Sequence, residues 1–218
     1  MAESSAQAHT WDPMERFNRT MFRFNDRLYT YALRPATRAY ERAVPKPVRQ
    51  GIVNAFDNLH FPIRFVSSLL EGRVGRAARE TEKFGLNTVL GLGGLIRVSD
   101  QVPQLAHLPP QDVGLAFGSW GIGAGPYVVL PILGPGDVRD FAGEACDYFL
   151  SPTNWDAIHL GHRTWIANPY RVPIQSLDVA SAIPRAIHAY DAVVGDAVDP
   201  YIAAREAFFS HRRADAAR

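Results

Sequence analysis

The feature that most limits how this chain can fold is a stretch of 24 residues without a charge, residues 113–136. A neutral segment of this length could cross a bilayer as a helix. However, it contains seven glycines and three prolines, which interrupt helices and leave backbone groups without partners. Lipid cannot bond those groups, so irregular backbone occurs at membrane depth only inside protein or along a cavity. We expect a re-entrant loop held by helices, with a short hairpin around residues 127–133; a buried glycine-rich loop of a soluble protein is the alternative.

Most of the remaining chain is predicted to be helical. Apolar residues recur at helical spacing, and prolines mark the starts of new helices after Pro35, Pro45 and Pro47. A kink is expected at Pro184. The expected helices cover residues 14–31, 47–59, 63–70, 73–90, 137–150 and 173–198, with a last helix opening at Asp199. The sequence therefore predicts one mainly α domain with a glycine- and proline-rich loop or short β-hairpin.

Two of these helices have unusually placed side chains. In the helix of residues 14–31, apolar side chains share one narrow arc and arginines share another. In residues 63–70, apolar side chains spread over an arc of roughly 160°. A helix of that length is too short to span a bilayer but suits its interface. An ordinary core helix is the alternative interpretation of residues 63–70.

Charge and motifs argue against nucleic-acid binding and catalysis. The formal net charge of +1 is too small to indicate a nucleic-acid partner. Ser119 lacks the first glycine of a nucleophile elbow, and the glycine-rich segments do not lie between a strand and a helix as nucleotide-binding loops do. His159 and His162 have no third ligand at a recognisable spacing, so no metal site is expected.

Two further features have plain structural interpretations. Cys146 is the only cysteine, which rules out an intrachain disulfide and predicts a small buried apolar residue. Four acidic residues recur at helical spacing, and we interpret them as a solvated face or as partners of arginines. They are Asp137, Asp140, Glu144 and Asp147.

Six short blocks occur in order along the chain. They read Asp12-Pro13-x-Glu15-x-Phe17-Asn18-Arg19-x-x-Phe22-x-Phe24-Asn25; Asn58-x-x-x-Pro62; Phe84-x-x-Asn87-Thr88-x-Leu90-Gly91-x-Gly93-Gly94, with Asp100 beyond; Gly121-x-Gly123-x-Gly125-Pro126-Tyr127-x-x-x-Pro131-x-x-Gly134; Arg139-Asp140; and Asp199-Pro200-Tyr201-x-x-x-Arg205. This set resembles the MlaA/VacJ family, the phospholipid-transport lipoproteins of the Gram-negative outer membrane. We accordingly expect a flexible segment over residues 1–10, an MlaA/VacJ-like domain over residues 11–212 and a frayed tail over residues 213–218.

The resemblance implies a single-domain ring of amphipathic helices around a central pore, lying in the periplasm-facing leaflet of the outer membrane. Family members take mislocalised phospholipids from the outer leaflet through the pore and pass them to a periplasmic lipid carrier, MlaC. They sit beside trimeric porins, and this retrograde transport maintains lipid asymmetry. A protein of this kind is not an enzyme and requires no cofactor, metal or nucleic acid.

The resemblance also suggests roles for individual residues. Neutral side chains suit acyl chains and glycines let lipid approach the backbone, so the lipid-pore candidates are Gly121, Gly123, Gly125, Pro126, Tyr127 and Leu130. Guanidinium groups pair with phosphate, so the head-group candidates are Arg16, Arg19 and Arg23, for which a solvated face or pairing with acidic residues is the alternative.

Other candidate residues concern the membrane and the frame of the domain. The membrane-interface candidates are Phe61, Phe65, Leu69 and Leu70. The motif residues expected to cap and pin helices are Asn18, Asn25, Asn58, Asn87, Gly93, Gly94, Asp199, Tyr201 and Arg205.

Alternative functions and the location of the protein also follow from these patterns. A soluble periplasmic scaffold that binds a porin or carrier without moving lipid is the second hypothesis, and a phospholipase-like enzyme lacks a visible nucleophile and base. Family lipoproteins carry a signal peptide and a lipidated cysteine before the Asp-Pro block, and this chain shows neither. Met1 stands about where that cysteine belongs. We expect a leader to have been left out rather than a cytoplasmic protein.

Overall fold

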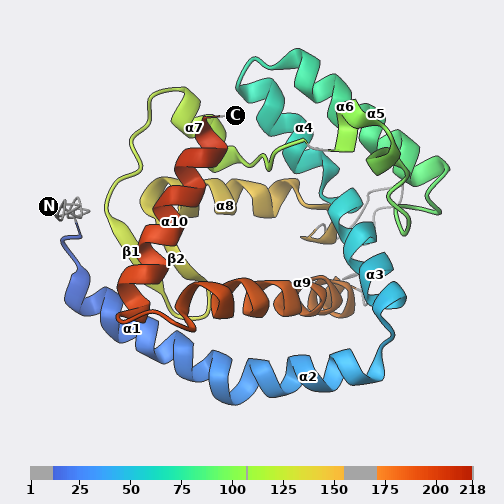
Figure 1. Cartoon of the computed structure of the whole chain (residues 1–218). Coiled ribbons are helices and arrows are strands. Elements are labelled where there is room, and N and C mark those ends of the chain that lie inside the picture. Colours follow the sequence, from blue (N-terminus) through green and yellow to red (C-terminus); the bar gives the residue numbers. More distant parts are fainter. Residues whose placement is uncertain (1–11, 107, 155–170, 218) are drawn as a thin grey trace, which may run out of the picture.

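The structure is a computed structural model that describes residues 12–106, 108–154 and 171–217. Its helices are arranged as a ring, with a small β-hairpin on the side where the N-terminal helix begins (Figure 1). The elements are α1 (Glu15–Leu28), α2 (Arg34–Ala43), α3 (Lys46–Leu59), α4 (Phe61–Leu70), α5 (Val74–Val89), α6 (Pro103–Ala106), α7 (Val113–Ser119), β1 (Tyr127–Leu130), β2 (Gly134–Asp137), α8 (Val138–Leu150), α9 (Arg171–Val194) and α10 (Pro200–Ala216). The predicted mainly α single domain with a β-hairpin is confirmed.

The first two helices form one continuous path, although a break before Pro35 was expected. A π-helical turn, η1 (Tyr29–Leu33), connects them, and the Arg34 N–H bonds to the carbonyl of Tyr29 five residues back. Pro35 lies in the first turn of α2, where a missing N–H costs no helical hydrogen bond. The wider π turn therefore lets the helix pass through the proline and form one edge of the ring.

The neutral stretch begins with a helix, where only irregular backbone was expected. The Asp112 side chain caps α7 by accepting a hydrogen bond from the Leu115 N–H at 2.7 Å. The glycines here permit close packing of α7 on α8, because a Cβ on Gly143 would lie 2.3 Å from the backbone nitrogen of Gly114. Residues 127–137 form the expected hairpin, in which Tyr127 pairs with Asp137.

The last helix extends to Ala216, past the point where the sequence predicted fraying. Arg212 of α10 donates to Asp112 at 2.7 Å and also bonds Asp140 of α8. Because these ion pairs are partly buried, they hold the end of α10 against α7 and α8.

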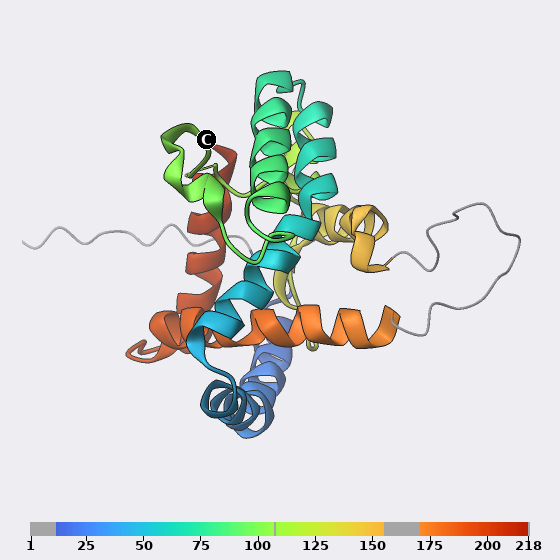
Figure 2. The same ribbon diagram turned by 90° about the vertical axis from the view of Figure 1, so that its right-hand side faces the viewer.

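Helix α9 crosses the ring and is bonded to both sides of it (Figures 1 and 2). Near its C-terminal end, the Tyr190 hydroxyl donates to Asp26 of α1 at 2.9 Å. Closer to its N-terminal end, Asp178 contacts His60, between α3 and α4, at 3.0 Å. Helix α9 continues through Pro184 and ends at Val194, just before Gly195.

The core is small and lies beside the hairpin. Tyr127, Val129 and Tyr201 are almost fully buried and pack against partly buried apolar residues of α1 and α10. Cys146 is exposed on α8, so the expectation that it is buried was wrong; α8 buries only the side that carries Asp140 and Gly143. None of the helices in the described ranges combines the length and hydrophobicity needed to cross a membrane.

Candidate functional site

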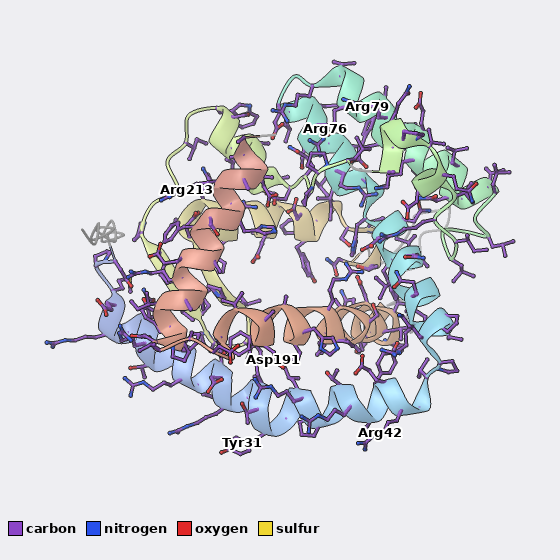
Figure 3. The ribbon with its side chains drawn as sticks, viewed as in Figure 1. Tyr31, Arg42, Arg76, Arg79, Asp191 and Arg213 are labelled. Carbon is purple, nitrogen blue, oxygen red and sulfur yellow. The ribbon has the colours of Figure 1, made fainter. Side chains whose placement is uncertain are left out.

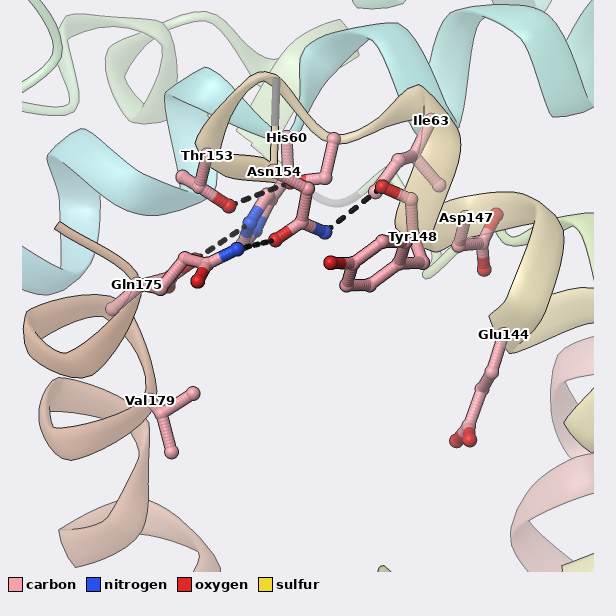
Figure 4. A pocket seen from close by; sticks show the side chains of 11 residues that line it. His60, Ile63, Glu144, Asp147, Tyr148, Thr153, Asn154, Gln175 and Val179 are labelled. Carbon is pink, nitrogen blue, oxygen red and sulfur yellow. Dashed lines mark hydrogen bonds and ion pairs between the residues drawn. The ribbon is translucent and has the colours of Figure 1, made fainter. Parts of the chain in front are cut away.

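A cavity of about 470 Å³ opens at the inner side of the ring, where α8 faces α9 (Figure 4). Its size is in the range of ligand-binding clefts. The described residues that line it come from α4, α8, α9 and the turns beside them: His60, Ile63, Glu144, Asp147, Tyr148, Ser151, Thr153, Asn154, Gln175, Asp178 and Val179.

Hydrogen bonds fix one wall of this cavity. Asn154 accepts a hydrogen bond from Gln175 Nε2 at 2.6 Å and donates to the Tyr148 carbonyl at 2.8 Å, so the end of α8 is joined to α9. The contact of His60 Nε2 with the Asp178 carboxylate, at 3.0 Å, continues this wall toward α4. Tyr148 and Val179 extend from opposite helices toward the open space and remain exposed (Figure 4).

The cavity carries negative charge. Glu144 and Asp147 of α8 and Asp178 of α9 line it, and no lysine or arginine is among its described lining residues. Burial raises the pKa of Asp147 to about 7, and burial also raises the pKa of Glu144. The four acidic residues predicted to share one side of this helix therefore have two roles. Asp137 and Asp140 stabilise the fold, whereas Glu144 and Asp147 line the cavity.

Many large apolar side chains of the domain are exposed. In the described part of the chain, exposed large apolar side chains outnumber buried ones. Phe17, Phe24 and Tyr31 lie at seven-residue spacing on the α1 path and are 42%, 49% and 79% exposed. Large exposed apolar patches are rare on soluble monomers, so apolar side chains repeated along one helix path favour contact with an apolar environment or a partner. Other exposed members are Leu69, Leu70, Val74, Val89, Leu90, Leu92, Leu95, Ile96, Trp120, Ile122, Ile132 and Leu133.

The membrane-interface candidates lie on α4 within this surface. Leu69 and Leu70 are exposed, and the Leu70 carbonyl accepts a hydrogen bond from Trp120 Nε1 at 2.8 Å. Phe61 and Phe65 are half-buried because Phe61 stacks on Phe84 of α5 with ring centres 4.5 Å apart. Phe61 and Phe65 therefore support the packing of α4 on α5, and Leu69 and Leu70 are available to an outside partner.

The head-group candidates on α1 differ from one another. Arg19 pairs with Glu15 at 2.7 Å and with Asp199 at 2.9 Å, and its guanidinium lies 4.5 Å from the centre of the Tyr201 ring. Arg16 and Arg23 are exposed, and neither makes an ion pair with a described residue. The pairing alternative thus describes Arg19, and a head-group role for Arg16 and Arg23 stays a prediction.

None of the six lipid-pore candidates is among the described residues that line the cavity. Gly121, Gly123 and Gly125 lie in the exposed loop between α7 and β1, followed by half-buried Pro126. Tyr127 belongs to the core, and the Leu130 carbonyl bonds to α1. Their role in a lipid path stays a prediction.

Two asparagines of α1 hold strand β1. Asn18 donates from Nδ2 to the Tyr127 carbonyl at 3.0 Å and accepts from the Val129 N–H at 2.9 Å. One heptad later, Asn25 bonds the Leu130 carbonyl and the Ile132 N–H in the same way, both at 2.8 Å.

A buried cluster links the start of α1 to α10. The Tyr201 hydroxyl donates to Asp12, and Arg205 lies 3.6 Å from the same carboxylate, which is fully buried. Asp12 also accepts from Asn18, and Asp199 caps α10 through the N–H groups of its first turn. The chain entering α1 is thereby fixed to the last helix.

The third motif block forms a turn after α5. Asn58 donates to Thr88 at 2.9 Å, and Asn87 accepts from the Ser99 N–H at 2.9 Å. Gly94 has a φ of +97°, and a Cβ there would lie 2.6 Å from the Cβ of Asn58. Gly93 has a φ of +72° but open space around it.

Sequence reasoning missed the residues of the cavity. Glu144 and Asp147 were interpreted as a solvated face or as partners of arginines, and His60, Asp178 and Val179 carried no motif. The available signal was the i, i+3 spacing of these two acidic residues, which places them on the same side of α8. His159 and His162, together with the segment of residues 1–10, lie outside the described residues.

These observations define a class of protein: a single helical domain with many exposed apolar side chains and a cavity between α8 and α9 that is lined by acidic, amide and apolar side chains. The chain belongs to the MlaA lipoprotein family, whose model matches residues 10–215.

Known relatives cover most of the chain. The intermembrane phospholipid transport system lipoprotein MlaA of Escherichia coli (strain K12) is 35% identical over 200 residues, which is 91% of this chain and 75% of the relative. The MlaA lipoprotein of Haemophilus influenzae is 31% identical over 201 residues, covering 92% and 77%. A solved structure described as "Structural basis for maintenance of bacterial outer membrane lipid asymmetry" has a TM-score of 0.72 and 35% identity, covering 94% of this chain and 99% of that one.

Proposed function

We propose that this protein takes mislocalised phospholipids out of the outer leaflet of the outer membrane and passes them through the ring to a periplasmic lipid carrier of the MlaC type. It lies in the periplasm-facing leaflet beside a trimeric porin, and this retrograde transport maintains lipid asymmetry. It acts without chemical turnover. The observation that carries the proposal is the combination, in one small domain, of many exposed apolar side chains with a cavity lined by both polar and apolar groups.

The outer face supports the location. Many large apolar side chains are exposed, but no helix in the described ranges is both long and apolar enough to cross a membrane, so the protein suits one leaflet better than a full crossing. Burying one large apolar side chain in lipid contributes about 1.5–3 kcal/mol, and several together hold the ring in the membrane.

The cavity supports passage of an amphiphile. Its wall carries carboxylates, amides and hydroxyls next to Ile63, Tyr148 and Val179. A phospholipid head group can exchange water for the polar groups, while its tails follow the apolar ones. The names of the relatives, which are lipoproteins of an intermembrane phospholipid transport system, agree with this cargo.

The proposal is tested with the purified chain reconstituted into liposomes that hold fluorescent phospholipid in the outer leaflet, plus a periplasmic lipid carrier as acceptor. We expect labelled phospholipid to reach the carrier only when the chain is present. Binding of the porin or carrier without lipid transfer would support the scaffold hypothesis instead. Release of free fatty acid would show an enzyme and contradict the proposal.

A further inference from the structure

A second cavity, of about 570 Å³, lies between the N-terminal half of α5 and the segment around α6. It shares no lining residue with the central cavity. Figure 3 labels two of its residues, Arg76 and Arg79, on the α4–α5 side of the ring. The described residues that line it are Arg73, Arg76, Arg79, Pro103, Gln104, Leu108 and Pro109.

Three arginines follow one side of α5. A spacing of three residues places Arg73, Arg76 and Arg79 within an arc of about 120°. Arg76 is only 6% exposed, and it donates from one terminal nitrogen to the Pro109 carbonyl. Its Nε is buried and has no hydrogen-bond partner among the described residues. Arg76 therefore brings an incompletely paired guanidinium to this pocket.

The two flanking arginines differ in their pairing. Arg73 lies 3.3 Å from Glu71, which also accepts a hydrogen bond from Gln111. Arg79 is exposed and makes no ion pair with a described residue. The next acidic residue, Glu80, is fully buried and bonds to Arg64 of α4 at 2.8 Å. Positive charge at the pocket therefore exceeds the negative charge that is close enough to balance it.

This arrangement is unfavourable for the fold. Burial lowers the pKa of Arg76, and the charges of Arg73 and Arg79 lower it further, although Glu80 and Glu71 offset part of this effect. The first turn of α5 contains no acidic residue. The N-terminus of a helix carries partial positive charge, so cations there are destabilising and an anion is stabilising.

We propose that Arg73, Arg76 and Arg79 form a binding site for a phosphate-bearing anion, distinct from the central cavity. Arg76 lies at the buried bottom of this site, and Arg79 completes the site from the solvent side. Guanidinium groups match phosphate oxygens with paired hydrogen bonds. The pocket is larger than one phosphate requires and includes Leu108 and two prolines, which gives room for a glycerol or alkyl group on the phosphate. The shared chemistry is a phosphate ester or free phosphate.

The test is calorimetric titration of the full chain, held in amphipol, with inorganic phosphate, glycerol 3-phosphate and dihexanoyl phosphatidic acid. Glycerol is the uncharged control probe. We expect saturable binding of the phosphate probes that weakens with salt. Tightest binding of the dihexanoyl lipid identifies a lipid head group as the source, and equal affinity for all three identifies free phosphate. Saturation by none of them overturns the proposal.

Variants locate the binding. R79E changes an exposed residue, and we expect its affinity for phosphate to fall on the order of tenfold or more, because charge-assisted hydrogen bonds are the strong ones. R42E makes the same change at an exposed arginine of α2, away from the pocket, and is expected to bind as the parent does. R76Q tests the buried arginine at the bottom of the pocket, and circular dichroism shows whether this variant folds. An equal loss in R42E, or unchanged affinity in both R79E and R76Q, overturns the proposal.

Discussion

Asn18 takes the place of a neighbouring strand for Val129. Its Oδ1 accepts the Val129 N–H at 2.9 Å, and its Nδ2 donates to the carbonyl two residues earlier, at Tyr127. Strand β2 covers the other edge of β1. A two-stranded hairpin is at best marginally stable alone. The asparagines of α1 bond the free edge of β1, where a third strand would otherwise pair.

Replacing Asn18 with leucine removes both hydrogen bonds and leaves two buried backbone groups unpaired. We expect the free energy of unfolding to fall by about 2–4 kcal/mol, as measured by denaturant titration. Thr20→Ala, an exposed change on the same helix, serves as the control and is expected to have little effect. Equal stability of the two variants would contradict a strand-like role for Asn18.

Arg205→Ala leaves the buried carboxylate of Asp12 without its cation. We expect a loss of about 3–5 kcal/mol in unfolding free energy, because an unpaired buried charge is costly. Arg213→Ala, on an exposed position of the same helix, is the matched control. The double variant Arg205→Ala with Asp12→Asn removes the charge as well and should recover part of the loss; no recovery would show that the ion pair is not the cause.

Gly93 and Gly94 provide a neighbouring pair for comparison. Alanine at Gly93 meets only the strain of a positive φ, which costs roughly 1 kcal/mol. Alanine at Gly94 meets the same strain and also overlaps Asn58. We expect Gly94→Ala to lower the melting temperature clearly more than Gly93→Ala. The reverse order would mean that this turn does not pack against Asn58 as described.

Asp147 is expected to make stability depend on pH. Burial raises its folded pKa to about 7, above the ordinary value of 3.8 for this side chain, so the folded state holds the proton more tightly. Stability should therefore fall as the pH rises from about 4 to about 7, with Asp112 and Glu144 adding to the shift and Arg212 opposing it. Asp147→Asn keeps an acceptor for the Val113 N–H and should flatten this decline in melting temperature. An unchanged pH profile would contradict a proton held at Asp147.

The longer helices were predictable because they have their own periodicity and start signals, whereas the short α6 and α7 were not predicted. Pro200 after Asp199 marks α10 correctly, and the short hairpin expected around residues 127–133 is present at residues 127–137. The continuous path through Pro35 was not predictable from the sequence, because a π turn depends on how α1 and α2 pack into the ring.

The cavity was less accessible to sequence reasoning than the fold. Its lining residues come from segments separated by more than a hundred positions, such as His60 and Asp178, which meet only when α9 crosses the ring. The neutral stretch drew attention because it lacks charge, but part of it serves core packing through Tyr127 and Val129. Polar residues at ordinary helical spacing gave no comparable signal.

The most direct test of the account is phospholipid transfer by a variant in which the central cavity is obstructed. Val179 and Val172 lie on the same helix and are 63% and 65% exposed, but only Val179 lines the cavity. With labelled phospholipid transfer to the carrier as the readout, Val179→Trp is expected to lower the rate several-fold, whereas Val172→Trp leaves it unchanged. Equal rates in the two variants would contradict passage of lipid through this cavity.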